Sequence, residues 1–161
     1  MYTITPYEAR YKDKVANLVL AIQQKEFNLP VTLEGQPDLC NPETFYKNGQ
    51  SCFWLAVEKE NVIGSIGLLD IDNGQGVIRK MFVEKSNRGK DKAVAQNLYN
   101  TLEQHCKNNH INELFLGTIN VLQAAQHFYI RNGFQVVRKD LLPGTFPVMS
   151  VDDLFFRKLL Q

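Results

Sequence analysis

The chain has 161 residues, of which 44% are hydrophobic and 22% charged, the size and composition of one globular domain. Its 18 Lys and Arg against 17 Asp and Glu leave a net charge of +1, too small to draw in a polyanion such as DNA from a distance. No apolar run approaches the roughly 20 residues that span a bilayer, and the N-terminus lacks the apolar core of a signal peptide. We therefore expect a cytoplasmic protein with no nucleic-acid or membrane partner.

Residue types that hold metals or carry redox chemistry are few and widely spaced. No two cysteines form a CxxC motif, and the histidines lack the spacing of a metal site, among themselves or with the cysteines. These residues are Cys40, Cys52, Cys106, His105, His110 and His127. The pattern predicts reduced, mostly buried thiols and no metal.

The first third of the chain predicts a strand, two helices and an irregular connection. Residues 1–6 favour a strand, and apolar residues over 11–22 recur at helical spacing. Residues 27–41 hold two prolines and a glycine, which predicts an irregular connection. Asn41 and Pro42 then supply an N-cap and a first-turn proline for a short second helix.

The middle of the chain predicts an antiparallel meander of three strands over residues 52–58, 62–71 and 76–83. Asn73-Gly74, between the last two, is a strong hairpin signal, because a type I′ turn needs positive φ at both central residues. The apolar stripe over 94–106 then has the spacing of a helix packed on the sheet.

The last third predicts a buried strand over 113–117, a helix that ends at Asn132-Gly133, and two strands over 134–138 and 154–160. No linker or repeat interrupts the pattern, so we expect one domain over residues 1–161. The order of elements predicts an α+β or mixed α/β fold, with helices on the faces of a sheet.

The stretch over residues 77–98 is the strongest local signal of chemistry. It predicts a buried strand, a charged turn around Gly89, and the start of a helix. A helix N-terminus leaves several backbone N–H groups unpaired, and the Arg and Lys residues beside them favour an anion. On these residues alone, a phosphate cradle and a solvated turn that caps a helix are both open.

A second motif, AQHFYIRNGF, lies at residues 125–134. Together the two segments resemble the GNAT family of N-acetyltransferases, whose acetyl-CoA loop follows Q/R-x-x-G-x-G/A and whose later helix follows A-x-x-F-Y-x-x-x-G-F. The second pattern matches completely, and the first matches at Arg88 and Ala93. The predicted order of elements fits that family over nearly the full length.

The resemblance implies a fold and a site for acetyl-CoA. The fold is a mostly antiparallel, twisted sheet of about seven strands flanked by about four helices, with a cofactor cleft where the fourth and fifth strands splay apart. Leu114 and Leu116 would wall this cleft. The implied cofactor-binding residues are Met81, Phe82 and Val83 for the pantetheine arm, Arg88, Gly89, Lys90, Asp91, Lys92 and Ala93 for the pyrophosphate, and Asn120.

Two of these positions depart from the family pattern. The family usually has glycine where this chain has Asp91, and a carboxylate about 6 Å from the pyrophosphate would cost roughly 3 kcal/mol unless it turned to solvent. Asn120 stands two residues further from Phe128 and Tyr129 than is usual in the family.

The resemblance also implies a catalytic residue. Tyr129 matches the tyrosine that donates a proton as CoA leaves as a thiol, a role that a partly buried phenol can fill. Phe128 is interpreted as a core residue. The attacking amine must be uncharged, so a base or a chain of waters must accept its proton. Five carboxylates remain open as that base: Glu34, Asp38, Asp70, Asp72 and Glu84.

The charged residues of the predicted hairpin allow two interpretations. Asp70 and Asp72 would pair across the hairpin with Arg79 and Lys80. If Arg79 or Lys80 instead faces the cleft, an acceptor that carries a carboxylate is expected.

The resemblance thus predicts an N-acetyltransferase that moves the acetyl group of acetyl-CoA to a primary amine of a small molecule or amino-acid-like acceptor, by direct attack in a ternary complex. A non-catalytic acyl-CoA-binding or regulatory module on the same scaffold is the alternative. A homodimer through the last strands is compatible with the pattern. The sequence does not identify the acceptor. In this family its pocket is built from irregular segments, here 27–50 and 140–153, and periodicity does not show where their side chains point.

Overall fold

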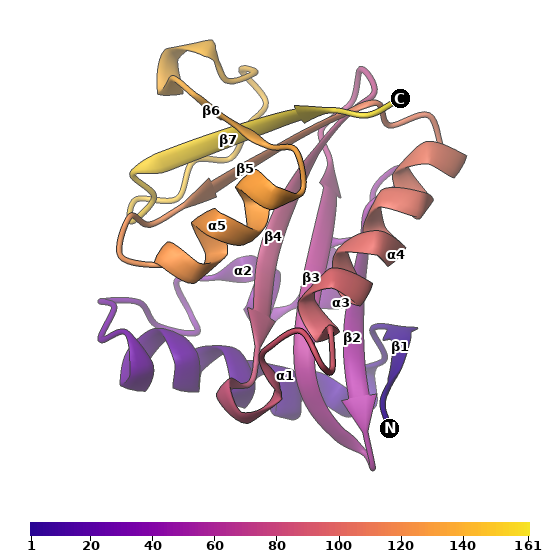
Figure 1. Ribbon diagram of the computed structural model, residues 1–161, viewed down its shortest axis with the longest axis vertical. Helices are drawn as coiled ribbons and strands as arrows, with labels where there is room; N and C mark the ends of the chain where they lie inside the picture. The colour runs from indigo at the N-terminus through magenta and orange to yellow at the C-terminus, as the bar shows by residue number, and fades with distance from the viewer.

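The computed structural model describes residues 1–161, and one seven-stranded sheet runs through it (Figure 1). The strand order is β1-β2-β3-β4-β5-β7-β6, and every neighbouring pair is antiparallel except β4 and β5. The strands are β1 (Thr3–Pro6), β2 (Cys52–Glu58), β3 (Asn61–Asp70), β4 (Gln75–Val83), β5 (Glu113–Thr118), β6 (Gln135–Val137) and β7 (Leu154–Leu159). The predicted fold class, a mixed sheet of seven mostly antiparallel strands, is confirmed.

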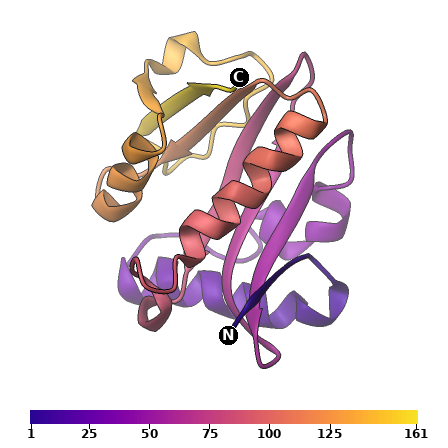
Figure 2. The same ribbon diagram turned by 45° about the vertical axis from the view of Figure 1, so that its right-hand side comes forward.

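Five α-helices cover the two faces of this sheet. Helices α4 and α5 lie on one face, and α1, α2 and α3 lie on the other (Figures 1 and 2). No helix is both long and apolar enough to cross a bilayer. The helices are α1 (Lys12–Leu20), which a π-helical turn extends over Ala21–Glu26, α2 (Pro37–Cys40), α3 (Pro42–Phe45), α4 (Val94–Asn108) and α5 (Gln123–Arg131).

Each face has its own apolar core, as the amphipathic patterns predict. The larger cluster packs α4 and α5 on the sheet around Leu98, Leu114 and Phe156, each at most 1% exposed. The second packs α1 to α3 around Val15 and Leu39, both fully buried. Burial on both faces fixes the orientation of the strands between the two helical layers.

The structure corrects two local predictions. The segment predicted as irregular contains α2, because Pro37 sits in the first turn of a helix, where its missing N–H costs no hydrogen bond. The β3–β4 hairpin forms as predicted, but Asp72, Asn73 and Gly74 all have positive φ, so its turn is longer than the expected two-residue type.

The functional cleft originates where β4 and β5 part. The two strands pair only from Gln75 to Val77 on β4, whereas β4 continues to Val83 and the rest of β5 pairs with β7 alone. Figure 1 shows β5 turning away from β4 beyond this short contact. Leu114 and Leu116, predicted to wall the cleft, lie instead in the apolar core.

Candidate active site

A cleft opens between the diverging strands and reaches from one face of the sheet to the other. Six segments line it: the free edge of β4, the end of β5 with the loop after it, helix α5, the turn that follows α1, the segment before α2, and the loop before β7. The residues that line the cleft include Gln23, Gln36, Arg79, Lys80, Met81, Phe82, Gly117, Thr118, Tyr129, Met149 and Asp152. Side chains from both helical layers therefore meet in one cleft.

The N-terminus of α4 forms a second hollow beside this cleft. The backbone N–H groups of residues 89–92 and 94–96 have no hydrogen-bond partner in the protein. Gly89 and the N-cap residue Ala93 both have positive φ, 115° and 53°, so the loop turns sharply on both sides of these amides before the helix begins. Arg88, Gly89, Lys90 and Ala93, all predicted pyrophosphate residues, line the hollow together with Val83. Free amides of this kind suit a phosphate group.

The charged side chains of this loop differ in their availability. The Arg88 guanidinium binds both carboxylate oxygens of Glu26, at 2.6 and 2.8 Å, and its Nε donates to the Val83 carbonyl, so its charge is already paired. Lys90 has no ion-pair partner and lines the hollow. Asp91 and Lys92 are exposed and do not line it. Asp91 thus points to solvent, the arrangement that avoids repulsion of a phosphate.

Met81, Phe82 and Val83 occupy the part of β4 that lies beyond the contact with β5. Met81 and Phe82 line the cleft, and Val83 lines the adjoining hollow, so the three residues connect the two spaces along a free strand edge. Asn120 is placed differently: it is exposed, its N–H donates to Asp153 at 2.8 Å, and it does not line the cleft.

Tyr129 projects from α5 into the cleft. Its ring packs against Phe128, Phe134 and Phe156, and the residue is only 6% exposed. Its hydroxyl makes no hydrogen bond to the protein, unlike that of Tyr99, which bonds Glu103 and Lys158. Burial, together with the charge of Asp152, raises the pKa of Tyr129 above its usual value, so the phenol stays protonated. The cleft therefore contains a fixed, uncommitted O–H donor.

A β-bulge in β4 places two cations on the same side of the strand. Ser65 and Gly67 of β3 face Phe82 and Arg79, so β4 carries one extra residue there, and Lys80 adopts a positive φ of 51°. The Ser65 hydroxyl donates to the Lys80 carbonyl at 2.7 Å and holds this backbone. In a regular strand neighbouring side chains point to opposite faces. The bulge instead lets Arg79 and Lys80 both reach the cleft.

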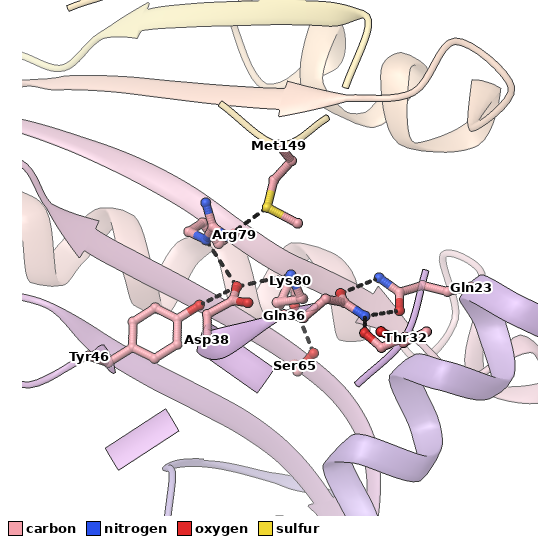
Figure 3. A network of polar contacts seen from close by, with 9 residues as sticks. All are labelled: Gln23, Thr32, Gln36, Asp38, Tyr46, Ser65, Arg79, Lys80 and Met149. Carbon is pink, nitrogen blue, oxygen red and sulfur yellow. Dashed lines mark hydrogen bonds and ion pairs between the residues drawn. The ribbon is translucent and has the colours of Figure 1, made fainter. Parts of the chain in front are cut away.

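Both cations meet the buried carboxylate of Asp38, which α2 supplies. Arg79 Nε lies 2.9 Å and Lys80 Nζ 3.0 Å from Asp38 Oδ2, which also accepts the Tyr46 hydroxyl at 3.3 Å (Figure 3). Asp38 Oδ1 is buried without a partner. Burial alone would raise the pKa of Asp38, but the charges of Lys80 and Arg79 outweigh it and lower the pKa. The predicted pairing of these cations with Asp70 and Asp72 is therefore wrong.

The same burial acts in opposite directions on the two cations. Desolvation lowers the pKa of Lys80, only partly offset by Asp38. For Arg79 the attraction of Asp38 outweighs desolvation and the pKa is raised, so the guanidinium is permanently charged. The side chains are 8% and 6% exposed for Arg79 and Lys80. The cleft therefore contains two largely desolvated cations that share one carboxylate.

Asp152 brings a second carboxylate to the cleft, from the loop before β7. It packs against β5 so closely that a Cβ on Gly117 would lie 2.5 Å from its Oδ2, so any side chain there would displace the Asp152 carboxylate. Burial raises the pKa of Asp152 to about 6, although Arg79 and Lys80 oppose the rise. Asp152 forms no ion pair with either cation. It was not among the carboxylates predicted from the sequence, because loop residues carry no periodicity that would show their direction.

None of the five predicted bases lines the cleft. Glu34 and Asp72 are exposed, and Asp70 accepts the Gln50 N–H at 2.8 Å. Glu84 is bonded to Ser86 and Asn87. Asp38 itself is sealed by its two cations, so Asp152 is the carboxylate available in the cleft.

Two glutamines close the side of the cleft that faces α1. Gln23 and Gln36 exchange reciprocal amide hydrogen bonds of 2.8 and 3.0 Å, and Gln36 also donates to the Thr32 carbonyl at 3.0 Å (Figure 3). Their pairing ties the π-helical turn to the segment before α2. This wall is polar but uncharged.

Comparison with known proteins identifies the family. Residues 17–134, well over half of the chain, match the model of the acetyltransferase (GNAT) family. A GNAT-family acetyltransferase from Staphylococcus aureus Mu50 is 36% identical, with a TM-score of 0.95 over 100% of both chains. N-acetylaspartate synthetase from Xenopus tropicalis is 31% identical over 125 residues, which are 74% of this chain and 45% of that protein. The chain thus spans less than half of the length of this curated relative.

A more distant structure shares the fold alone. N-acetylglutamate synthase from Neisseria gonorrhoeae, solved in complex with coenzyme A and N-acetyl-glutamate, is 15% identical with a TM-score of 0.76, over 100% of this chain and 35% of that one. The free amides at α4, the splayed strands and the tyrosine of α5 agree with the family match. The chain belongs to the acetyltransferase (GNAT) family.

Proposed function

We propose that the protein is an acetyl-CoA-dependent N-acetyltransferase that acts on the primary amine of a small molecule or amino-acid-like acceptor. The observation that carries this proposal is the Tyr129 hydroxyl, which is held in the cleft by an aromatic cage and has no hydrogen-bond partner in the protein. A tyrosine that served only packing would bury its ring and satisfy its hydroxyl elsewhere, as Tyr99 does.

The residues of the cleft fit an acyl-CoA. The amides of residues 89–96 and the Lys90 ammonium would hold the pyrophosphate, and the free edge of β4 at Met81 to Val83 would hold the pantetheine amides. The thioester supplies the activated acetyl group. Its sulfur would then lie near Tyr129, since the helix that carries this residue borders both spaces.

The transfer requires one bond to form and one to break. The amine nitrogen uses its lone pair to form a bond to the acetyl carbon, and the carbon–sulfur bond breaks with both electrons left on sulfur. Tyr129 donates its phenolic proton to that sulfur as the bond breaks. The proton lost by the nitrogen then returns to the Tyr129 phenolate through Asp152 or water. The raised pKa of Tyr129 keeps it protonated at neutral pH, ready to donate.

A relative supports this class of acceptor. The name of N-acetylaspartate synthetase points to an N-acetylated amino acid as the product of that relative. A non-catalytic acyl-CoA-binding module would share the cofactor residues but would have no reason to keep an uncommitted phenol in the cleft.

The test is Tyr129→Phe, assayed by release of CoA thiol with a broad panel of amines and amino acids. We expect kcat to fall by about 100-fold or more, while the KM for acetyl-CoA changes little. Because the hydroxyl makes no hydrogen bond in the protein, its removal should leave the melting temperature nearly unchanged.

Tyr99→Phe is the matched control. It removes a hydroxyl that bonds Glu103 and Lys158 outside the cleft, so it should lower stability and leave kcat unaltered. Thermal shift with CoA tests the binding that an enzyme and a binding module share, and thiol release from acetyl-CoA then tells them apart, because only the enzyme consumes acetyl-CoA. Ligand stabilisation without thiol release across the whole panel would refute the enzymatic function.

A further inference from the structure

The acceptor end of the cleft has an uneven distribution of charge. On the β4 side, Arg79 and Lys80 share the single carboxylate of Asp38, so this group of three carries a net positive charge whenever Lys80 is protonated. Across the cleft, Asp152 carries a carboxylate without an ion-pair partner. The cleft therefore has a positive wall and a negative wall that do not neutralise each other by direct contact.

The Arg79 guanidinium retains donors that the protein does not use. Its Nε bonds Asp38, and Nη2 contacts only the Met149 sulfur at 3.3 Å, a weak acceptor. Nη1 has no partner, and it is not sealed from solvent, since the only buried and unpartnered side-chain atom is Asp38 Oδ1. Figure 3 shows the guanidinium between Asp38 and Met149, at the edge of β4. Its free side faces the cleft, and a planar fork of this kind matches a carboxylate.

The backbone is strained where the two cations are placed. Lys80 holds a left-handed φ that is unfavourable for a residue with a Cβ, and the bulge it creates serves to bring both cations to one side. One cation is enough to neutralise the single carboxylate of Asp38, so the second cation adds a positive charge that the protein does not balance there. A binding role for the second charge explains why the strain and the desolvation are tolerated.

We infer that the cleft recognises a zwitterion: the carboxylate of a free amino acid lies against Arg79 and Lys80, and its ammonium lies toward Asp152, the group that accepts its proton. This inference rests on the proposed function and names its substrate class. A ligand with both charges neutralises the two walls at once. An amine without a carboxylate would leave the excess positive charge of Arg79, Lys80 and Asp38 without a counter-charge in a desolvated site, and that cost gives the discrimination.

The first experiment uses the unaltered protein and matched acceptors. Each amino acid of a complete panel is compared with its carboxamide and with the amine that decarboxylation would leave, at saturating acetyl-CoA. We expect kcat/KM for at least one amino acid to exceed that of both neutral analogues by about 100-fold or more. A dipeptide with the same N-terminal residue keeps both charges but moves the carboxylate away, and it should also be poor.

The second experiment changes the cation. Arg79→Gln should raise the KM for the amino acid by about 10-fold or more and should narrow its advantage over the carboxamide, with the KM for acetyl-CoA unchanged. Arg79→Lys keeps the positive charge beside Asp38, so the protein should still fold, but it removes the planar guanidinium. A loss of amino-acid preference in this variant therefore reports on binding and not on folding. Arg138→Gln is the control, because Arg138 is an exposed partner of Asp140 outside the cleft.

The outcomes separate this inference from the function on which it rests. Comparable rates for an amino acid and its decarboxylated amine, or a dipeptide better than any free amino acid, would overturn the inference and leave the N-acetyltransferase intact. If no acceptor led to thiol release, both the inference and the proposed N-acetyltransferase function would be refuted. An amino-acid preference that persists in Arg79→Gln would also contradict the assigned carboxylate site.

Discussion

The two ends of the cleft are built in different ways. At the proposed cofactor end, the groups available for binding are backbone amides of one continuous turn and helix start, together with two cations that have no ion-pair partner, Lys90 and Arg131. At the acceptor end the binding groups are side chains, brought together from α2, β4 and the loop before β7. An amide is supplied by every residue but proline, whereas a buried charge is specific to one residue. Under the proposed function, a change of sequence would therefore alter the acceptor end more than the cofactor end.

The ends also differ in how their charges are balanced. The cofactor loop is exposed, so its charges are screened by water and each contributes little to stability. The charges at Asp38 are desolvated and depend on one another. This contrast predicts large effects of substitution at the acceptor end and small effects at the cofactor end.

Asp38→Asn should have the largest effect. It leaves Arg79 and Lys80 desolvated without their counter-charge, and breaking a buried ion pair in this way costs roughly 3–5 kcal/mol. Urea denaturation should show the midpoint falling at an unchanged m-value. Asp140→Asn is the control, since the exposed pair of Asp140 with Arg138 should make no measurable contribution. Equal stability of the two variants would show that the Asp38 cluster is not the desolvated group described above.

Asp152 should link stability and activity to pH with opposite signs. Burial raises its pKa from 3.8 to about 6, so between these values the folded protein binds more protons than the unfolded one. The contribution of Asp152 to the free energy of unfolding should therefore fall as pH rises from about 4 to 6. Over the upper part of that range kcat/KM should rise, because only the ionised carboxylate can accept the proton of the acceptor amine.

Asp152→Asn should abolish both trends. The charged groups that face Asp152 are Arg79 and Lys80 on β4 and the neighbouring Asp153, and the neutral phenol of Tyr129 faces it from α5. All four groups remain in this variant. Unfolding followed at several pH values, together with the pH profile of kcat/KM, measures the two trends separately. An acidic limb near pH 6 that survives in Asp152→Asn would assign the proton acceptor to another group.

The same contrast explains how far the sequence could predict the molecule. Strand and helix order follows from apolar periodicity, and most of the hollow at the start of α4 is formed by residues 83–96, which are close in sequence, so both could be anticipated. The acceptor end could not, because the partners of Arg79 depend on a bulge at Lys80 and on a loop that carries Asp152. Two signals were nevertheless present. Consecutive cations inside a buried strand require a buried anion, and Pro37 followed by an acidic residue marks a helix start.

The smallest effects are expected at the cofactor loop, where Lys90 and Asp91 form a matched pair of neighbours. Lys90 lines the hollow without an ion-pair partner, so Lys90→Gln should weaken CoA binding about threefold to tenfold, and less so at high salt. Asp91 is exposed and outside the hollow, so Asp91→Asn should change the affinity by less than about twofold, since screening by water removes most of its repulsion. Calorimetric titration with CoA at two salt concentrations measures both. A marked gain in affinity for Asp91→Asn would mean that this carboxylate turns toward the pyrophosphate, and that the loop binds the cofactor in a conformation in which its charges matter as much as its amides.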